Sequence, residues 1–203
     1  MALPDTDMRL DLAEEDVLRA DLYDLLSLVL ARPPSKDLIT KISELTGDTS
    51  DLGQGINALS RLARQVTPRA VEDEFNTLFI GLTRGELLPY ASYYMTGFLN
   101  EKPLAILRNA MARHGIERAE NVYEPEDNIA SLCEMMAGLI RGRFGDPADL
   151  SAQKDFFAAH ISPWAEHFFT DLEGAKSSVF FAPVGAIGRA FIAIEREAFR
   201  MGA

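Results

Sequence analysis

Three acidic side chains lie close together in the run Glu124-Pro125-Glu126-Asp127-Asn128. Carboxylates at this spacing can bind guanidinium groups through charge-assisted hydrogen bonds. Acids and a proline also suit the first turn of a helix, where free amides create a positive end. The run therefore predicts a helix that opens at Glu124. Whether its acids only cap that helix or also bind a cationic ligand is left open by the sequence.

A second segment combines a loop with closely spaced aromatic residues. The loop covers residues 81–89, ends at Pro89, and is followed by Tyr90, Tyr93 and Tyr94. Tyrosine has a large apolar ring and a polar tip, which suits a surface that binds peptides. The same rings could instead pack the loop onto the core. If both segments bind, their ligand should be cationic and apolar.

The sequence contains few residue patterns that are typical of catalytic or metal-binding sites. Cys133 lies beside apolar residues in a predicted helix, which favours a packed thiol over a reactive one. The three histidines, His114, His160 and His167, have no cysteine pair or H-E-x-x-H motif with them. No nucleotide-binding loop is found. We therefore predict no catalytic residue, no metal ligand and no cofactor; an acid–base enzyme with paired carboxylates is a weaker alternative.

The amino-acid composition and net charge limit the kinds of molecule that the protein is expected to bind. The chain has 203 residues and a net charge of -11, so it should repel nucleic acid and attract a basic partner. It has one cysteine, which fits a reducing compartment. No apolar run reaches the roughly 20 residues that cross a bilayer, and the N-terminus does not resemble a secretory signal. Stable membrane insertion is therefore not expected.

Helical periodicity dominates the chain. Apolar residues at helical spacing predict helices over 18–30, 38–45, 52–66, 71–79, 90–95, 104–114, 124–140, 156–161, 163–172 and 180–198. The Arg32-Pro33-Pro34 run should end the first, and Thr67-Pro68 should open the fourth. No alternating strand pattern or linker is found. We predict a single compact all-α domain of eight to ten helices over residues 1–203, with residues 1–10 disordered.

Three motifs resemble those of a known family. Residues 124–130, with Glu134 and Met136-Ala137, resemble the E-P-x-D-H-I-A…E-x-x-M-A signature of the TorD/DmsD/NarJ redox-enzyme maturation chaperones. Residues 75–81 resemble that family's Y/F-N-x-L-F-x-G, and residues 89–94 resemble its P-Y-x-S-x-Y. The order and spacing of all three agree with the family.

This resemblance implies a cytoplasmic, all-helical chaperone without enzymatic activity. It implies binding of the twin-arginine signal peptide and apo form of a molybdopterin oxidoreductase until the cofactor is inserted. Residues 160–164 and 180–185 are similar to members that accompany formate dehydrogenases. A non-catalytic helical scaffold or regulator is the alternative. The sequence leaves open whether the chain is a monomer or a homodimer, and whether a guanine nucleotide or the molybdenum cofactor binds.

The resemblance also implies a set of binding residues. Arginines of the peptide are expected at acidic residues, and its apolar stretch at the aromatic segment. The predicted site comprises Glu124, Glu126, Asp127, Asn128, Phe79, Pro89, Tyr90, Ser92 and Tyr94. Two positions depart from the signature, because Asn128 replaces its histidine and Leu132 replaces an acid. Asparagine can keep a hydrogen bond but not a titratable charge, and Leu132 is expected to remove one carboxylate from the site.

Overall fold

Helices form nearly all the regular structure of the chain. The computed structural model describes residues 12–120 and 122–202. Its elements are α1 (Glu14–Leu30), α2 (Lys36–Ser43), α3 (Asp51–Ala63), α4 (Pro68–Phe75), a π-helical turn η1 (Asn76–Ile80), α5 (Ala91–Thr96), α6 (Lys102–Arg113), α7 (Ile129–Arg141), α8 (Leu150–His160), α9 (Ala165–Gly174) and α10 (Ala182–Met201). The predicted all-α fold of eight to ten helices is confirmed. The predicted disorder of residues 1–10 lies outside the described residues.

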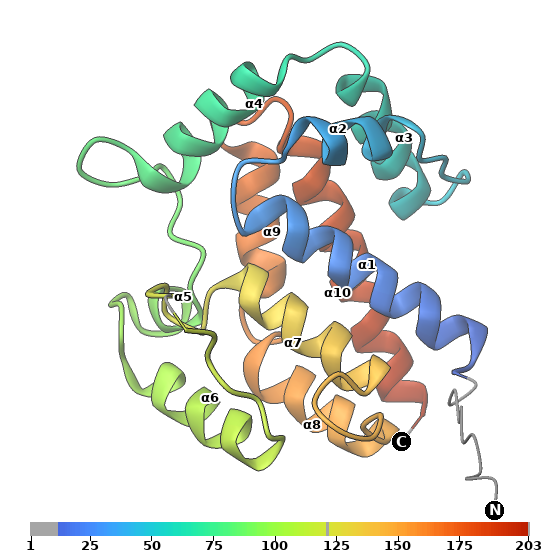
Figure 1. Cartoon of the computed structure of the whole chain (residues 1–203), viewed down its shortest axis with the longest axis vertical. Helices are drawn as coiled ribbons and strands as arrows, with labels where there is room; N and C mark the ends of the chain where they lie inside the picture. The colour runs from blue at the N-terminus through green and yellow to red at the C-terminus, as the bar shows by residue number, and fades with distance from the viewer. Residues whose placement is uncertain (1–11, 121, 203) are drawn as a thin grey trace, which may run out of the picture.

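The core lies where α1, α7, α9 and α10 stack in the middle of the molecule (Figure 1). α7 packs against α1, and α10 packs against both α9 and α3. Most of α7 is buried, including Cys133 as predicted. Burial raises the pKa of the Cys133 thiol, which keeps it protonated and poorly nucleophilic. A helix that is apolar on nearly all sides belongs at the centre of a domain.

Large aromatic rings are buried on α9 and beside the first residues of α9 and α10. The largest buried side chains here include Trp164, Phe168, Phe169 and Phe181. Each contributes roughly 1.5–3 kcal/mol through burial. α10 can approach α9 closely because Gly188 lacks a side chain: a Cβ atom there would lie 2.2 Å from the Phe169 ring. This glycine is therefore required by the packing of the two helices.

A buried polar network fixes α1 against α10. Arg19 donates from Nε to Glu195 Oε1 at 2.7 Å and from Nη2 to Oε2 at 3.0 Å. The Tyr23 hydroxyl donates to the same Oε2 at 3.0 Å. Because Glu195 is only 1% exposed, these bonds are needed to compensate for its lost hydration. They align the helix whose C-terminal end borders the candidate site.

Helix boundaries follow the capping residues, with one correction. Ser35, Ser50, Thr67 and Asp149 each accept a backbone hydrogen bond as N-cap residues, and Pro68 occupies the first turn of α4 as predicted. The prediction that a helix opens at Glu124 is wrong. α7 begins at Ile129, with Asn128 as its N-cap. Residues 125–128 form a turn instead, in which the amide of Asn128 donates to the Pro125 carbonyl at 3.2 Å.

Within the described residues, no helix is both long enough and apolar enough to cross a bilayer.

Candidate peptide-binding groove

Two segments far apart in the sequence are joined by backbone hydrogen bonds. The amide of Ala91 donates to the Asp127 carbonyl, and the amide of Ile129 donates to the Pro89 carbonyl, each at 2.9 Å. Tyr90 and Asn128 form an isolated antiparallel bridge between them. The tyrosine segment and the acidic segment predicted from the sequence therefore lie side by side.

Asp127 braces this junction from inside the protein. Its Oδ2 atom accepts a hydrogen bond of 2.7 Å from the amide of Ser92, at the start of α5. Both residues have a relative exposure of 0%. A carboxylate without solvent access cannot meet an arginine of a docked peptide. Asp127 and Ser92 therefore hold the two segments together and do not line the surface.

Glu126 braces the junction from the opposite side. It accepts hydrogen bonds from Arg108 Nε at 3.1 Å and Nη2 at 2.9 Å, and Arg118 lies 3.7 Å away. Burial alone would raise the pKa of Glu126, but these cations and hydrogen bonds hold it below its ordinary value. Glu126 borders a separate hollow of about 390 Å³ between α6 and the loop that follows it. Its charge is thus already paired, and it ties α6 to the turn before α7.

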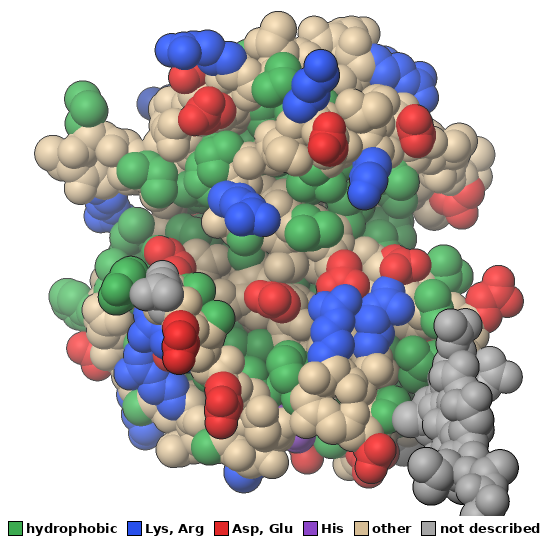
Figure 2. Space-filling model, viewed as in Figure 1, with side chains coloured by type: hydrophobic (Ala, Val, Ile, Leu, Met, Phe, Trp, Pro, Cys, Tyr) green, Lys and Arg blue, Asp and Glu red, His purple; other side chains and the backbone are tan. Residues whose placement is uncertain are grey.

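An open groove lies on the other side of the junction. It has a volume of about 480 Å³ and is lined by Ser27, Leu28, Leu30, Ala31, Arg32, Phe75, Phe79, Ile80, Pro89, Tyr90, Val122, Glu124, Asn128, Ala130, Ser131 and Glu134. The C-terminal end of α1, the turn η1 and the N-terminal end of α7 meet there (Figure 1). The same face carries hydrophobic side chains between scattered charges (Figure 2). The groove thus offers apolar contact with a few charged groups.

The groove includes five of the nine predicted residues: Phe79, Pro89, Tyr90, Glu124 and Asn128. Tyr94 lies elsewhere. Its ring packs against Trp164 and Phe168, at centroid distances of 5.3 and 6.0 Å, and its hydroxyl donates to Asp171 at 2.9 Å. Tyr94 therefore anchors α5 to α9.

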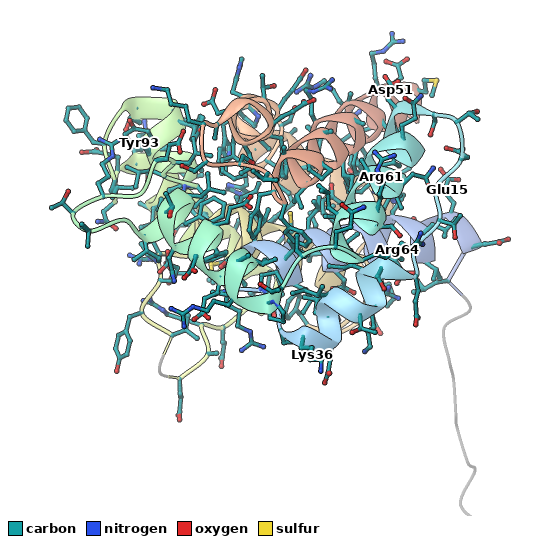
Figure 3. All side chains as sticks on the ribbon, turned by 90° about the horizontal axis from the view of Figure 1, so that it is seen from above. Glu15, Lys36, Asp51, Arg61, Arg64 and Tyr93 are labelled. Carbon is teal, nitrogen blue, oxygen red and sulfur yellow. The ribbon has the colours of Figure 1, made fainter. Side chains whose placement is uncertain are left out.

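Tyr93 points to the surface at one end of the molecule (Figure 3), where its hydroxyl accepts from Arg84 at 2.6 Å.

The π-helical turn shapes one wall of the groove. The amide of Gly81 donates to the Asn76 carbonyl at 2.7 Å, across five residues instead of four. Gly81 has a φ of +63°, which favours glycine, and ends the turn. The Phe79 ring packs edge-on against Phe75 at 4.9 Å. Ile80, which is 60% exposed, adds apolar surface at the rim.

Polar contacts orient Glu124 at the groove. Its Oε1 atom accepts a hydrogen bond from the Tyr90 hydroxyl and a second one, of 3.3 Å, from Asn128 Nδ2. Burial and the bond to Glu124 raise the pKa of Tyr90, so that the hydroxyl stays protonated and can donate. Asn128 also caps α7, because its Oδ1 atom accepts from the Ala130 amide at 2.9 Å. The residue that replaces the signature histidine therefore serves the groove and the helix together.

The expectation for Leu132 is wrong. Its relative exposure is 0%, and it belongs to the core of α7. The leucine therefore removes no carboxylate from the groove. Glu134, which lines the groove from the exposed side of α7, supplies a second acid there.

Other lining residues were not predicted from the sequence. Leu28 is 51% exposed, Ile80 60% and Val122 46%, although their residue type suggests burial. Arg32 was interpreted only as part of the run that ends α1. One feature of the sequence indicates that Leu28 is a surface residue: it lies outside the apolar face of α1, at a position where a polar residue is expected. Val122 gave no such signal, because it lies in an irregular connection.

The structure thus combines an all-helical fold with an open groove lined by apolar residues and a few charged ones, and no cluster that could hold a metal ion is found among its described residues. Residues 46–170 match the family described as the nitrate reductase delta subunit. The chaperone protein TorD of Vibrio cholerae is 33% identical over 150 residues, which cover 68% of each chain. That of Vibrio atlanticus is 24% identical over 200 residues, which cover 88% of this chain and 93% of its own.

A solved structure also has this fold. It is that of a protein from Archaeoglobus fulgidus, described as a redox enzyme maturation protein, with a TM-score of 0.57 and 23% identity over 87% of this chain and 94% of that one. The chain thus belongs to the nitrate reductase delta subunit family, and within it to the TorD-type chaperones of redox-enzyme maturation. The relatives are named as chaperones, in agreement with the predicted lack of enzymatic activity.

Proposed function

We propose that this chaperone acts in the cytoplasm and binds the twin-arginine signal peptide of an apo molybdopterin oxidoreductase in the groove. The observation that carries the proposal is the composition of the groove, where apolar residues surround two unburied carboxylates. Occupancy of the groove keeps the signal peptide from export until the cofactor has been inserted. A formate dehydrogenase is the proposed client, because residues 160–164 and 180–185 resemble chaperones that accompany such enzymes.

Apolar burial supplies most of the proposed affinity. Leu28, Ile80 and Val122 are each about half exposed at the groove, so a docked apolar helix or strand would cover them. Covering apolar surface stabilises a complex by roughly 25 cal/mol per Å², from which the cost of ordering the peptide is subtracted. Laying an apolar segment into a groove between helices is a common mode of peptide recognition.

The arginines of the peptide are assigned to Glu124 and Glu134. Glu124 receives hydrogen bonds at Oε1, which leaves Oε2 for a guanidinium group. Glu134 is exposed and makes no side-chain hydrogen bond to any residue the structure describes. Glu126 and Asp127 keep a role in the site, but as residues that position Tyr90 and Glu124.

Isothermal titration with a synthetic peptide tests this function. The probe contains an arginine pair followed by an apolar stretch. The Glu124→Gln, Glu134→Gln double variant should weaken binding about tenfold, because two charge-assisted contacts are lost. Leu28→Ser should weaken it by a similar factor. The matched control is Glu72→Gln, which removes an exposed charge from α4, outside the groove.

Equal affinity of the parent and the groove variants would refute peptide binding at this site. The client assignment is tested separately, by comparing signal peptides of a formate dehydrogenase and of an unrelated molybdoenzyme. Sedimentation of the chain with and without peptide determines whether the monomer or the homodimer binds.

A further inference from the structure

The groove continues beyond the residues of the three motifs. A second hollow of about 280 Å³ is lined by Leu28, Arg32, Pro33, Pro34, Ser35, Asp37, Leu38 and Lys41. Leu28 and Arg32 also line the first hollow, so the two adjoin at the C-terminal end of α1. A peptide that fills the first hollow can therefore extend into the second.

The sign of the charge reverses between these two adjoining hollows. The first hollow has Glu124 and Glu134 against Arg32, a formal sum of one negative charge. The second has Asp37 against Arg32 and Lys41, a formal sum of one positive charge. Arg32 is exposed, and no ion pair joins it to any residue within 12–120 or 122–202. Arg32 thus places a positive charge where the two hollows adjoin, in a chain whose net charge is -11.

We infer that Arg32 selects client peptides carrying an acidic side chain at the position that reaches the second hollow. This inference rests on the proposed function and adds a specificity element to it. An arginine pair is attracted to the acids of the first hollow and repelled by Arg32 and Lys41. An acid placed beyond the apolar contact at Leu28 would be attracted, so the charges set one orientation of the peptide.

The second hollow is suited to a selective contact. Pro33 and Pro34 have restricted backbone angles, so its wall loses little conformational freedom when a peptide binds. Arg32 can donate two parallel hydrogen bonds to the two oxygens of a carboxylate. A glutamine amide offers only one oxygen as acceptor, and its NH2 group finds no acceptor on the guanidinium. A glutamate in the peptide should therefore be preferred over a glutamine.

Three labelled synthetic peptides test the inference by fluorescence anisotropy. All contain an arginine pair and an apolar stretch. One has a glutamate before the arginines, one has a glutamate after the apolar stretch, and one has glutamine at both positions. With Arg32→Glu, the peptide that has a glutamate after the apolar stretch should bind about threefold to tenfold more weakly, since an attraction between exposed charges becomes a repulsion. Lysine in place of that glutamate should restore binding.

The control is Lys36→Glu, which makes an equal charge reversal on α2 at a residue lining neither hollow (Figure 3). If Arg32→Glu changes all three peptides no more than this control does, the inference is wrong. That outcome differs from failure of the proposed function. In the latter case the Glu124→Gln, Glu134→Gln variant would also retain full affinity, or the parent would bind no peptide.

Discussion

Two pairs of acids lie within one stretch of the chain, yet the structure uses them differently. Asp127 and Glu126 are buried and already bonded, to the Ser92 amide and to Arg108. Glu124 and Glu134 are exposed at the groove. Within one motif, the buried acids therefore hold the structure of the site together, and the exposed acids are free to contact a ligand. Substituting each pair in turn should separate loss of stability from loss of binding.

The largest expected effect is at Asp127. Asp127→Ala leaves the buried amide of Ser92 without its acceptor and opens the junction between residues 89–92 and 127–129. We expect the free energy of unfolding to fall by about 1–3 kcal/mol, measured by urea denaturation. Glu124→Ala should change it by less than about 0.5 kcal/mol, because the side chain is exposed.

The two variants should rank in the opposite order by their effect on peptide affinity, when affinity is measured on folded protein. Glu124→Ala should weaken binding more than Asp127→Ala does at a temperature where both variants are folded. If Asp127→Ala abolished binding at full stability, the division between bracing and contacting acids would be wrong.

A smaller effect with a distinct pH dependence is expected at Glu126. Its pKa in the folded protein lies below the ordinary value of 4.5. Its contribution to stability is therefore present above pH 4.5 and is lost as the pH falls through the folded pKa. Glu126→Gln should lower stability by about 1 kcal/mol at pH 7, reduced because Arg108 is half exposed. Denaturation at a series of pH values should show the parent and variant converging below pH 4.5.

The sequence predicted the fold because apolar periodicity is a local property. The buried faces of α1, α7 and α10 follow from spacing alone. The opening of α7 was misplaced because acids and Pro125 satisfy the rules for a first turn. The backbone at Asp127 is instead bonded to Ala91, a partner that helix rules do not include. A long-range bridge overrides local preference there.

The site was predicted only in part for the same reason. Motif spacing brought Tyr90 and Glu124 into one proposal, and the structure places them in hydrogen-bond contact. It could not show that Tyr94 turns toward α9, since adjacent tyrosines in a short helix point in different directions. Leu132 shows the opposite case: helical spacing predicts its burial, whereas comparison with the motif assigned its position to the site.

The smallest expected effect tests the departure from the signature at Asn128. Asn128→His replaces an N-cap whose Oδ1 accepts from the Ala130 amide, so stability should fall by about 0.5 kcal/mol. The imidazole has an ordinary pKa near 6.5, so lowering the pH from about 8 to 5.5 should add a positive charge beside Glu124. Affinity for the arginine-pair peptide should then fall by about twofold to fivefold in the variant, measured by anisotropy at constant ionic strength. The parent should change less over the same interval, since Asn128 does not titrate. Equal pH profiles for the two proteins would place the peptide's arginines away from Glu124, and would assign them to Glu134 on the exposed side of α7.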